Sequence, residues 1–217
     1  MTASTNSTSP RANPRGSVAS YDNAKVVNRF DLTKRLVAKL EKDEAVIGGV
    51  GNTNFDLWSA GRRPQNFYML GSMGLAIPIA LGVALAQPKR HVIALEGDGS
   101  LLMQLGTLAT IAGARPRNLT HLLFKNGVYH TSGSQDIPGG LTVDFVQMAK
   151  GAGYRKAYAV SDFEDFKRRL PSMLTDEGPL FVELHTGLAD KTPMTDRGGQ
   201  PFHQQVESLF QKLRKAG

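Results

Sequence analysis

The sequence predicts a single α/β domain in which a mostly parallel central sheet is flanked by helices on both faces. Short apolar runs alternate with helix-like segments from about residue 30 to residue 185. Glycine-rich turns follow several of the apolar runs, and neither an internal repeat nor a linker-like shift in composition divides the chain. We therefore expect one domain over residues 21–217, preceded by a disordered tail at 1–20.

The first half of the chain shows three apolar strands separated by helical segments. In order, we expect a helix around 32–40, a strand at 45–47, one or two helical turns at 55–60, a strand at 67–70, a helix at 76–86 and a strand at 91–95. Apolar residues recur at helical spacing in the first helix, where Asp31 is the expected cap. The helix at 76–86 is small and apolar all round, which is typical of a helix packed on many sides, and Pro78 is tolerated near its start.

The second half continues this alternation. In order, we expect a helix at 101–114, a strand at 119–124, a long loop at 127–140, a helix at 143–150, a strand at 154–160, a helix at 162–174, a strand at 180–184 and a closing helix at 204–215. The loop holds four glycines and a proline, which disfavour regular structure. Strands that alternate with helices pair in parallel, so their carboxyl ends lie along one edge of the sheet.

Composition excludes several classes of site. The chain has no cysteine, which rules out disulfides, thiolate zinc sites, iron–sulfur clusters and cysteine nucleophiles, and which fits a cytoplasmic protein. The formal charge is +7, but the basic residues are scattered and no recognition motif is present, so we expect no nucleic-acid partner. We find neither an apolar stretch of membrane-spanning length nor a signal-peptide core in the first 19 residues, and we expect no membrane association.

Two polar side chains follow successive predicted strands. Asp98 lies in a Glu-Gly-Asp-Gly-Ser run after the strand at 91–95, and Asn126 comes 28 residues later, after the strand at 119–124. If these strands are neighbours, they lie about 5 Å apart, and the two side chains can converge on one cation. Carboxylate and amide oxygens suit Mg²⁺ or Ca²⁺, and a backbone carbonyl just after Asn126 can add a further ligand.

The residues around Asp98 favour a phosphorylated ligand. Its flanking glycines let a phosphate approach the backbone closely, and Ser100 is expected to open a helix whose free N–H groups attract an anion. The predicted ligand is therefore a metal-bridged diphosphate. A generic nucleotide-binding protein is an alternative, but the glycine run at 48–51 has neither the G-x-G-x-x-G spacing nor a P-loop lysine.

These motifs resemble a known cofactor-binding family. The run Gly97-Asp98-Gly99, followed after 26 residues by Asn126, resembles the thiamine diphosphate motif. The chain is similar to the diphosphate-binding domain of phosphonopyruvate and sulfopyruvate decarboxylases over most of residues 30–185. The likeness is carried by residues 71–74, 101–103, 108–111, 126–129 and 132–135. It implies the thiamine diphosphate-binding fold, with thiamine diphosphate and Mg²⁺ as cofactors.

The resemblance implies a role for each matching residue. Asp98 and Asn126 would bind Mg²⁺ through their side chains, and Val128 would bind it through its carbonyl. The Gly71 carbonyl would accept a hydrogen bond from the 4′-amino group of the cofactor, and Met73 would be the apolar wedge that bends the cofactor into a V. The expected cofactor-binding residues are Asn52, Thr53, Gly71, Ser72, Met73, Gly97, Asp98, Gly99, Ser100, Asn126, Val128 and Tyr129.

The loop after the metal motif is where the substrate is expected. His130 is the candidate there for contacting the substrate or moving a proton. His121 lies within a strand and is expected to be structural. Lys125, His130 and Thr131 differ from what the family leads us to expect near the reaction centre, so the particular 2-oxo acid stays open.

The family also needs a glutamate that a second domain supplies, and this chain shows no such domain. None of its seven glutamates is an obvious substitute. We therefore expect the β subunit of a split 2-oxo acid decarboxylase (a carboxy-lyase), inactive without an α subunit that binds the pyrimidine and supplies the glutamate. The substrate would be a small anionic 2-oxo acid such as sulfopyruvate or phosphonopyruvate. The alternatives are a carboligase subunit similar to acetolactate synthase and a non-catalytic cofactor-binding module.

Overall fold

The computed structural model describes residues 27–41, 43–188 and 202–214, so the tail expected at 1–20 lies outside the described residues. The helices are α1 (Arg29–Val37), α2 (Asn52–Ala60), α3 (Ala76–Ala86), α4 (Asp98–Met103), α5 (Thr107–Ala114), α6 (Phe145–Ala152), α7 (Phe163–Thr175) and α8 (Phe202–Arg214). The strands are β1 (Ala45–Gly48), β2 (Asn66–Tyr68), β3 (Val92–Gly97), β4 (Leu119–Lys125), β5 (Val128–Tyr129), β6 (Gln135–Asp136), β7 (Lys156–Val160) and β8 (Leu180–His185).

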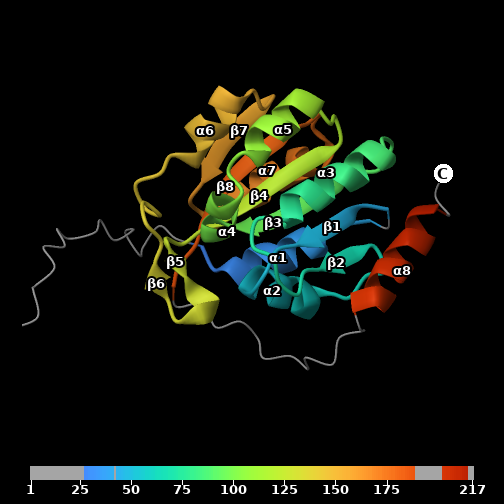
Figure 1. Cartoon of the computed structure of the whole chain (residues 1–217), viewed down its shortest axis with the longest axis horizontal. Coiled ribbons are helices and arrows are strands. Elements are labelled where there is room, and N and C mark those ends of the chain that lie inside the picture. Colours follow the sequence, from blue (N-terminus) through green and yellow to red (C-terminus); the bar gives the residue numbers. More distant parts are fainter. Residues whose placement is uncertain (1–26, 42, 189–201, 215–217) are drawn as a thin grey trace, which may run out of the picture.

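Six of the strands form one parallel sheet. Their order is β2-β1-β3-β4-β8-β7, and every neighbouring pair is parallel (Figure 1). The central strands β3 and β4 are buried along almost their whole length, which is why β3 begins with four apolar residues and β4 is apolar at Leu119 and at 122–124. The predicted fold class is confirmed.

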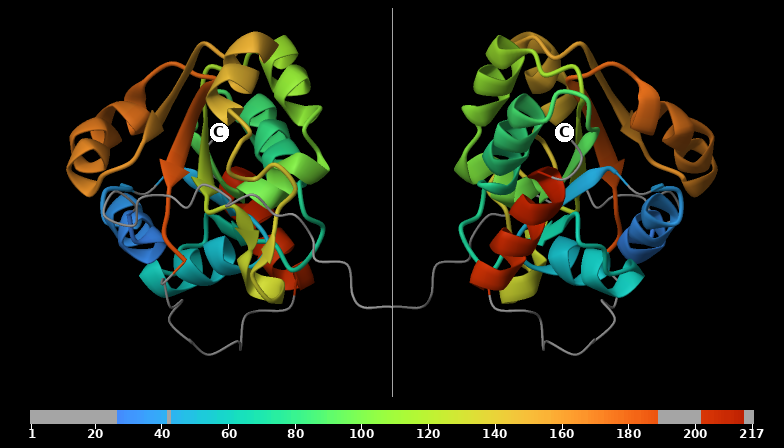
Figure 2. Two further views of the ribbon diagram at one scale, coloured as in Figure 1. Left: turned by 90° about the vertical axis from the view of Figure 1, so that its left-hand side faces the viewer. Right: turned by 90° about the vertical axis from the view of Figure 1, so that its right-hand side faces the viewer.

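Helices cover both faces of the sheet, as Figure 2 shows from two sides. One core cluster joins the sheet to α3, α5 and α6, and a second joins it to α1, α2 and α7. The apolar helix α3 begins and ends where the sequence predicts. No helix within the described ranges combines the length and the apolar character that a membrane crossing requires.

Several helices begin or end at residues other than those that the sequence predicts. The side chain of Asn28 caps α1 by accepting from the N–H of Asp31, so the expectation that Asp31 is the cap was wrong. The helix expected at 101–114 is two helices, because the chain turns at Gln104 before α5 begins. The first of these helices begins at Asp98 rather than at Ser100. The loop at 127–140 contains the antiparallel pair β5–β6 and a short 3₁₀ turn.

The strand order creates a crevice between β1 and β3. From β1 the chain passes through α2 to β2 at one edge, whereas from β3 it passes through α4 and α5 to β4 on the other side. The loops after β1 and β3 therefore leave toward opposite faces of the sheet. Such a switch point is where open α/β sheets bind ligands.

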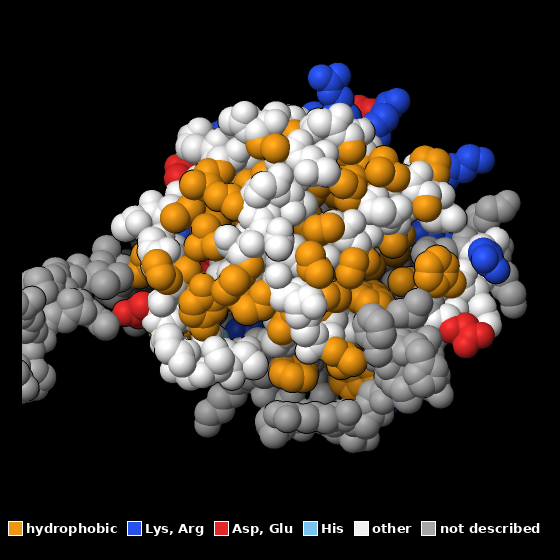
Figure 3. All heavy atoms as spheres, viewed as in Figure 1, with side chains coloured by type: hydrophobic (Ala, Val, Ile, Leu, Met, Phe, Trp, Pro, Cys, Tyr) orange, Lys and Arg blue, Asp and Glu red, His pale blue; other side chains and the backbone are white. Residues whose placement is uncertain are grey.

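Apolar side chains gather on the face that Figure 3 shows, where α3 and α5 lie in front. The large apolar residues that are exposed in and around these helices are Leu70, Leu75, Leu85 and Met103. Leu70 is 71% exposed, which is unusual for a leucine beside a sheet.

Candidate cofactor site

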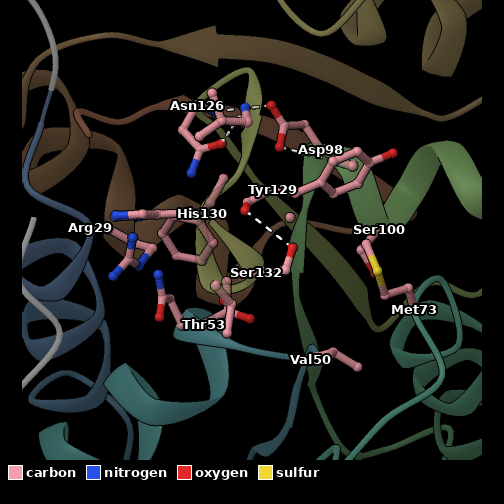
Figure 4. Close-up of a pocket in the computed structure, with 16 residues that line it drawn as sticks. Arg29, Val50, Thr53, Met73, Asp98, Ser100, Asn126, Tyr129, His130 and Ser132 are labelled. Carbon is pink, nitrogen blue, oxygen red and sulfur yellow. Dashed lines mark hydrogen bonds between the residues drawn. The ribbon is translucent and has the colours of Figure 1, made fainter. Parts of the chain in front are cut away.

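A cavity of about 170 Å³ opens at the carboxyl ends of β1, β3 and β4 (Figure 4). Its lining residues are Arg29, Val50, Asn52, Thr53, Met73, Gly97, Asp98, Gly99, Ser100, Phe124, Asn126, Val128, Tyr129, His130, Thr131 and Ser132. The structure thus brings together all the sequence-predicted site residues except Gly71 and Ser72. These two lie beside Met73 on an exposed turn and do not line the cavity.

Asp98 and Asn126 meet at the tips of neighbouring strands. Gly97 pairs with Phe124 in the β3–β4 register, which sets the two loops side by side. Asp98 Oδ2 accepts from the backbone N–H of Asn126 at 3.0 Å and of Gly127 at 2.7 Å, and Asp98 Oδ1 accepts from Gly99 N at 2.9 Å (Figure 4). The prediction that these strands adjoin is confirmed, and the Asp98 carboxylate contacts the backbone of Asn126.

The donor set suits a hard cation. Asn126 Oδ1 accepts from Val128 N at 3.0 Å and Asp98 Oδ1 accepts from Gly99 N, so each of these two oxygens keeps a second lone pair, whereas Asp98 Oδ2 already accepts two N–H groups. Burial raises the pKa of Asp98, and the backbone N–H groups of Gly127, Gly99 and Asn126 counteract part of that rise. A bound cation would favour the carboxylate further. No group of three or more His, Cys, Asp or Glu side chains within the described ranges could hold a metal, so phosphate and water are needed to complete an octahedral shell.

The loop after β1 forms one wall of the cavity. Gly51, at φ +84°, precedes α2, and no side chain caps this nine-residue helix. Asn52 and Thr53, in its first turn, line the cavity. The first backbone N–H groups of α2 are therefore available to an anionic ligand. A Cβ on Gly49 would lie 2.6 Å from the carbonyl oxygen of Leu95, so only glycine lets β1 turn this closely against β3.

The hairpin β5–β6 forms the opposite wall. It places Tyr129, His130 and Thr131 on the cavity, and its two strands pair through Tyr129 and Gln135. A Cβ on Gly99 would lie 2.5 Å from Tyr129 Cε1, so the hairpin packs directly on the Gly-Asp-Gly turn. Sequence periodicity missed this hairpin because two-residue strands show no alternation.

A buried carboxyl group, that of Glu96, contacts the Gly-Asp-Gly-Ser turn through Ser100. Glu96 is 1% exposed, and its Oε1 accepts a hydrogen bond from Ser100 Oγ. Ser100 Oγ in turn accepts from the backbone N–H of Gly74 at 2.7 Å. Burial raises the pKa of Glu96 to about 7, against the opposing effect of the Ser100 hydroxyl. Glu96 does not line the cavity.

Arg29 is a lining residue that sequence reasoning missed. It enters the cavity from α1, and its Nε lies 2.5 Å from Asp56 Oδ2 on α2. The side chains of Arg29 and Asp56 are only 2% and 0% exposed. The packing of α1 on α2 brings them together across 27 residues of sequence, and no local motif signals that contact.

Lys125 does not reach the cavity, although it directly precedes Asn126. Its ammonium donates to the Val143 carbonyl at 2.7 Å and lies 3.3 Å from Glu183 Oε1, which also contacts His185 Nε2 at 2.7 Å. The expectation that Lys125 lies near the reaction centre was therefore wrong, because residues alternate sides along a strand and Lys125 faces away from the cavity. The hydrogen bond from Lys125 to the Val143 carbonyl joins the end of β4 to the segment that follows the loop at 127–140.

His121 is a core residue, as expected. It lies within β4, with Phe181 and Tyr154 beside it, and burial lowers the pKa of its imidazole to about 3. A histidine that stays neutral in the core has no route to the cavity. His130 is the histidine that lines the cavity in the part of the chain that the structure describes.

Fold and site together define a class of protein. A parallel α/β domain with its cavity at the switch point, a carboxylate–carboxamide pair on adjoining strands and an uncapped helix beside it is a domain that binds a metal-bridged diphosphate. Residues 49–184 match the family model described as "Thiamine pyrophosphate enzyme, C-terminal TPP binding domain". The chain belongs to this family, whose cofactors are thiamine diphosphate and Mg²⁺.

Curated relatives refine the comparison. The chain is 38% identical to a phosphonopyruvate decarboxylase of Streptomyces viridochromogenes over 82% of this chain and 45% of that protein. It is 36% identical to the sulfopyruvate decarboxylase subunit beta of Methanothermobacter thermautotrophicus over 88% of this chain and 98% of that subunit. The chain thus spans less than half of the phosphonopyruvate decarboxylases it matches, and nearly the whole of this beta subunit.

A solved structure agrees with this placement. A thiamine diphosphate-dependent 4-hydroxybenzoylformate decarboxylase of Rhodococcus jostii RHA1 superimposes with a TM-score of 0.66 at 25% identity. The match covers 85% of this chain and 37% of that enzyme.

Proposed function

We propose that the chain is the β subunit of a split thiamine diphosphate-dependent 2-oxo acid decarboxylase, a hetero-oligomer in which it holds the Mg²⁺-diphosphate end of the cofactor. The observation that carries this proposal is the contact of Asp98 with Asn126 and Gly127 at adjoining strand tips. The chain belongs to a family of thiamine diphosphate-binding domains, and 88% of it aligns with 98% of a sulfopyruvate decarboxylase beta subunit.

The cavity suggests how the residues divide the work. Asp98, Asn126 and the Val128 carbonyl would hold Mg²⁺, while Gly97, Gly99, Ser100, Asn52, Thr53 and Tyr129 would surround the diphosphate. Met73 would support the bent cofactor, with the Gly71 carbonyl and Ser72 beside it. When bound, thiamine diphosphate supplies the electron sink for the bonding pair that CO₂ leaves behind. The chain itself positions that group and shields it from water.

Two features of the cavity support a partner subunit. Its volume of about 170 Å³ is below the roughly 300–1,000 Å³ of complete ligand pockets, so a second surface is needed to enclose the cofactor. No glutamate lines the cavity within the described residues, which leaves the activating glutamate to an α subunit that binds the pyrimidine. The exposed leucines Leu70 and Leu75 flank the Met73 turn, where such a subunit could bury them.

The hairpin wall supports a small anionic substrate. His130, Thr131 and Ser132 present polar groups next to the metal site, and His130 would contact the substrate or move its proton. The net charge of +7 and the names of the relatives favour sulfopyruvate or phosphonopyruvate. The cysteine-free composition is the support for a cytoplasmic location.

The test is turnover with and without the partner. The purified chain, given thiamine diphosphate and Mg²⁺, should release almost no CO₂ from sulfopyruvate or phosphonopyruvate. Addition of the polypeptide that matches the remaining half of the fused relatives should restore release. Robust turnover by the chain alone would reject the split-subunit proposal. Condensed products would indicate a carboligase, and binding without turnover in the complex would indicate a non-catalytic module.

A further inference from the structure

We propose that Glu96 is a positioning residue, which acts through Ser100 to fix the turn at 71–74, and with it Met73, against the Gly-Asp-Gly motif. The contacts form a chain: Gly74 N donates to Ser100 Oγ at 2.7 Å, and Ser100 Oγ donates to Glu96 Oε1. Met73 lies one residue before Gly74 and lines the cavity beside Ser100 (Figure 4). The inference deepens the proposed function and rests on it for its catalytic consequence.

The turn has features that call for such a tether. Ser72 has φ 64° and Gly74 has φ 85°, so two of its four residues are left-handed, and one of them is not glycine. A Cβ on Gly74 would lie 2.5 Å from Gln104 Cγ and 3.0 Å from the Ser100 carbonyl oxygen, so the turn sits close against α4. Leu70 and Leu75 at its two ends are exposed and add little packing on the outer side.

A proton count restricts what Ser100 can do for the cofactor. A serine hydroxyl carries one proton, and while Glu96 is ionised, that of Ser100 is donated to Glu96. Its side chain accepts from Gly74 and has no proton left for a phosphate oxygen. Any contact of Ser100 with the diphosphate then comes from its backbone N–H. The Ser100 hydroxyl accepts the hydrogen bond that holds the turn, and Glu96 orients that hydroxyl.

The burial of Glu96 supports its proposed role in orienting Ser100. A carboxylate that is 1% exposed costs free energy unless it is well paired, and an apolar residue would fill the same space more cheaply. The side-chain oxygen of Glu96 holds the Ser100 hydroxyl in one orientation. The pair thereby ties the diphosphate-binding motif of β3 to the segment that follows β2, two strands away in the sheet.

Amide exchange on the chain alone tests the tether without cofactor or partner. Exchange of the Gly74 amide should accelerate at least about tenfold in both Ser100→Ala and Glu96→Leu. Glu96→Gln, whose side-chain oxygen still accepts from Ser100, should stay within about threefold of wild type. The core variant Leu36→Ala, on the opposite face of the sheet, is the control for general destabilisation and should leave the relative protection of Gly74 unchanged.

Kinetics of the assembled enzyme test the consequence. Glu96→Leu should lower kcat about tenfold or more and leave the apparent affinity for Mg²⁺-thiamine diphosphate within about threefold, because Asp98 and Asn126 are untouched. Glu96→Gln should restore kcat, and Ser100→Ala with Glu96→Leu should be no worse than the poorer single variant. Unchanged Gly74 exchange in Glu96→Leu, or failure of Glu96→Gln to rescue, would overturn the inference. An inactive wild-type complex with the expected exchange pattern would instead reject the proposed function.

Discussion

Replacement of Asp98 separates its two duties, because its carboxylate both faces the metal position and accepts three backbone N–H groups. Asp98→Ala removes all three bonds. Each is worth about 0.5–1.5 kcal/mol net, and relief of burying a carboxylate whose pKa burial has raised offsets part of the loss. We expect a cost of about 2 kcal/mol, or about 4–8 °C in Tm for a chain of this size. Asp98→Asn keeps an acceptor oxygen and should cost about 1 kcal/mol.

Calorimetric titration with thiamine diphosphate, with and without Mg²⁺, checks the second duty. Both variants should lose at least about 100-fold in Mg²⁺-dependent affinity, because neither presents an anionic oxygen to the cation. Asp144→Ala is the matched control: it removes an exposed carboxylate that caps α6, so it should lower Tm and leave cofactor affinity unchanged. Wild-type affinity in Asp98→Ala would show that this side chain does not hold the metal.

Three further predictions follow from buried contacts. Arg29→Met removes the arginine partner of the Asp56 carboxylate, which is 0% exposed, so urea unfolding should show a loss of about 3–5 kcal/mol, most of which a second change, Asp56→Leu, should recover. His121 has a native pKa of about 3, below its ordinary value, so only the unfolded chain gains its proton between neutral pH and pH 5. That uptake removes about 2 kcal/mol of stability by pH 5, so the free energy of unfolding of His121→Phe, measured relative to wild type, should rise by this amount between pH 7 and pH 5; an unchanged difference would contradict it. Gly99→Ala places a methyl 2.5 Å from Tyr129, so it should displace the hairpin at a cost of about 1–3 kcal/mol and weaken cofactor binding; unchanged affinity and Tm would contradict the packing.

The sequence was sufficient for the fold and for the centre of the site because both depend on local signals. Short apolar runs revealed the buried strands β3 and β4, and the parallel arrangement then set Asp98 beside Asn126. The uniformly apolar α3 was recovered to the residue, since its composition leaves no alternative environment.

The sequence missed features that depend on contacts between distant segments. Arg29 reaches the cavity only because α1 packs on α2. Lys125 looked like a reaction-centre residue from its position in the chain, but the pleat of β4 turns it toward Glu183. The hairpin β5–β6 is too short to show a period, and its place is set by contact with Gly99.

The proposed metal site lies at the ends of β3 and β4, the two central strands of the sheet, and this location affects how the domain unfolds. Amides of β3 and β4 should be among the last to exchange, because freeing them requires the whole domain to open. The hairpin and the turn at 71–74 lie at the margin and can shift without disturbing that centre. Heat should therefore abolish cofactor retention and global order at the same temperature.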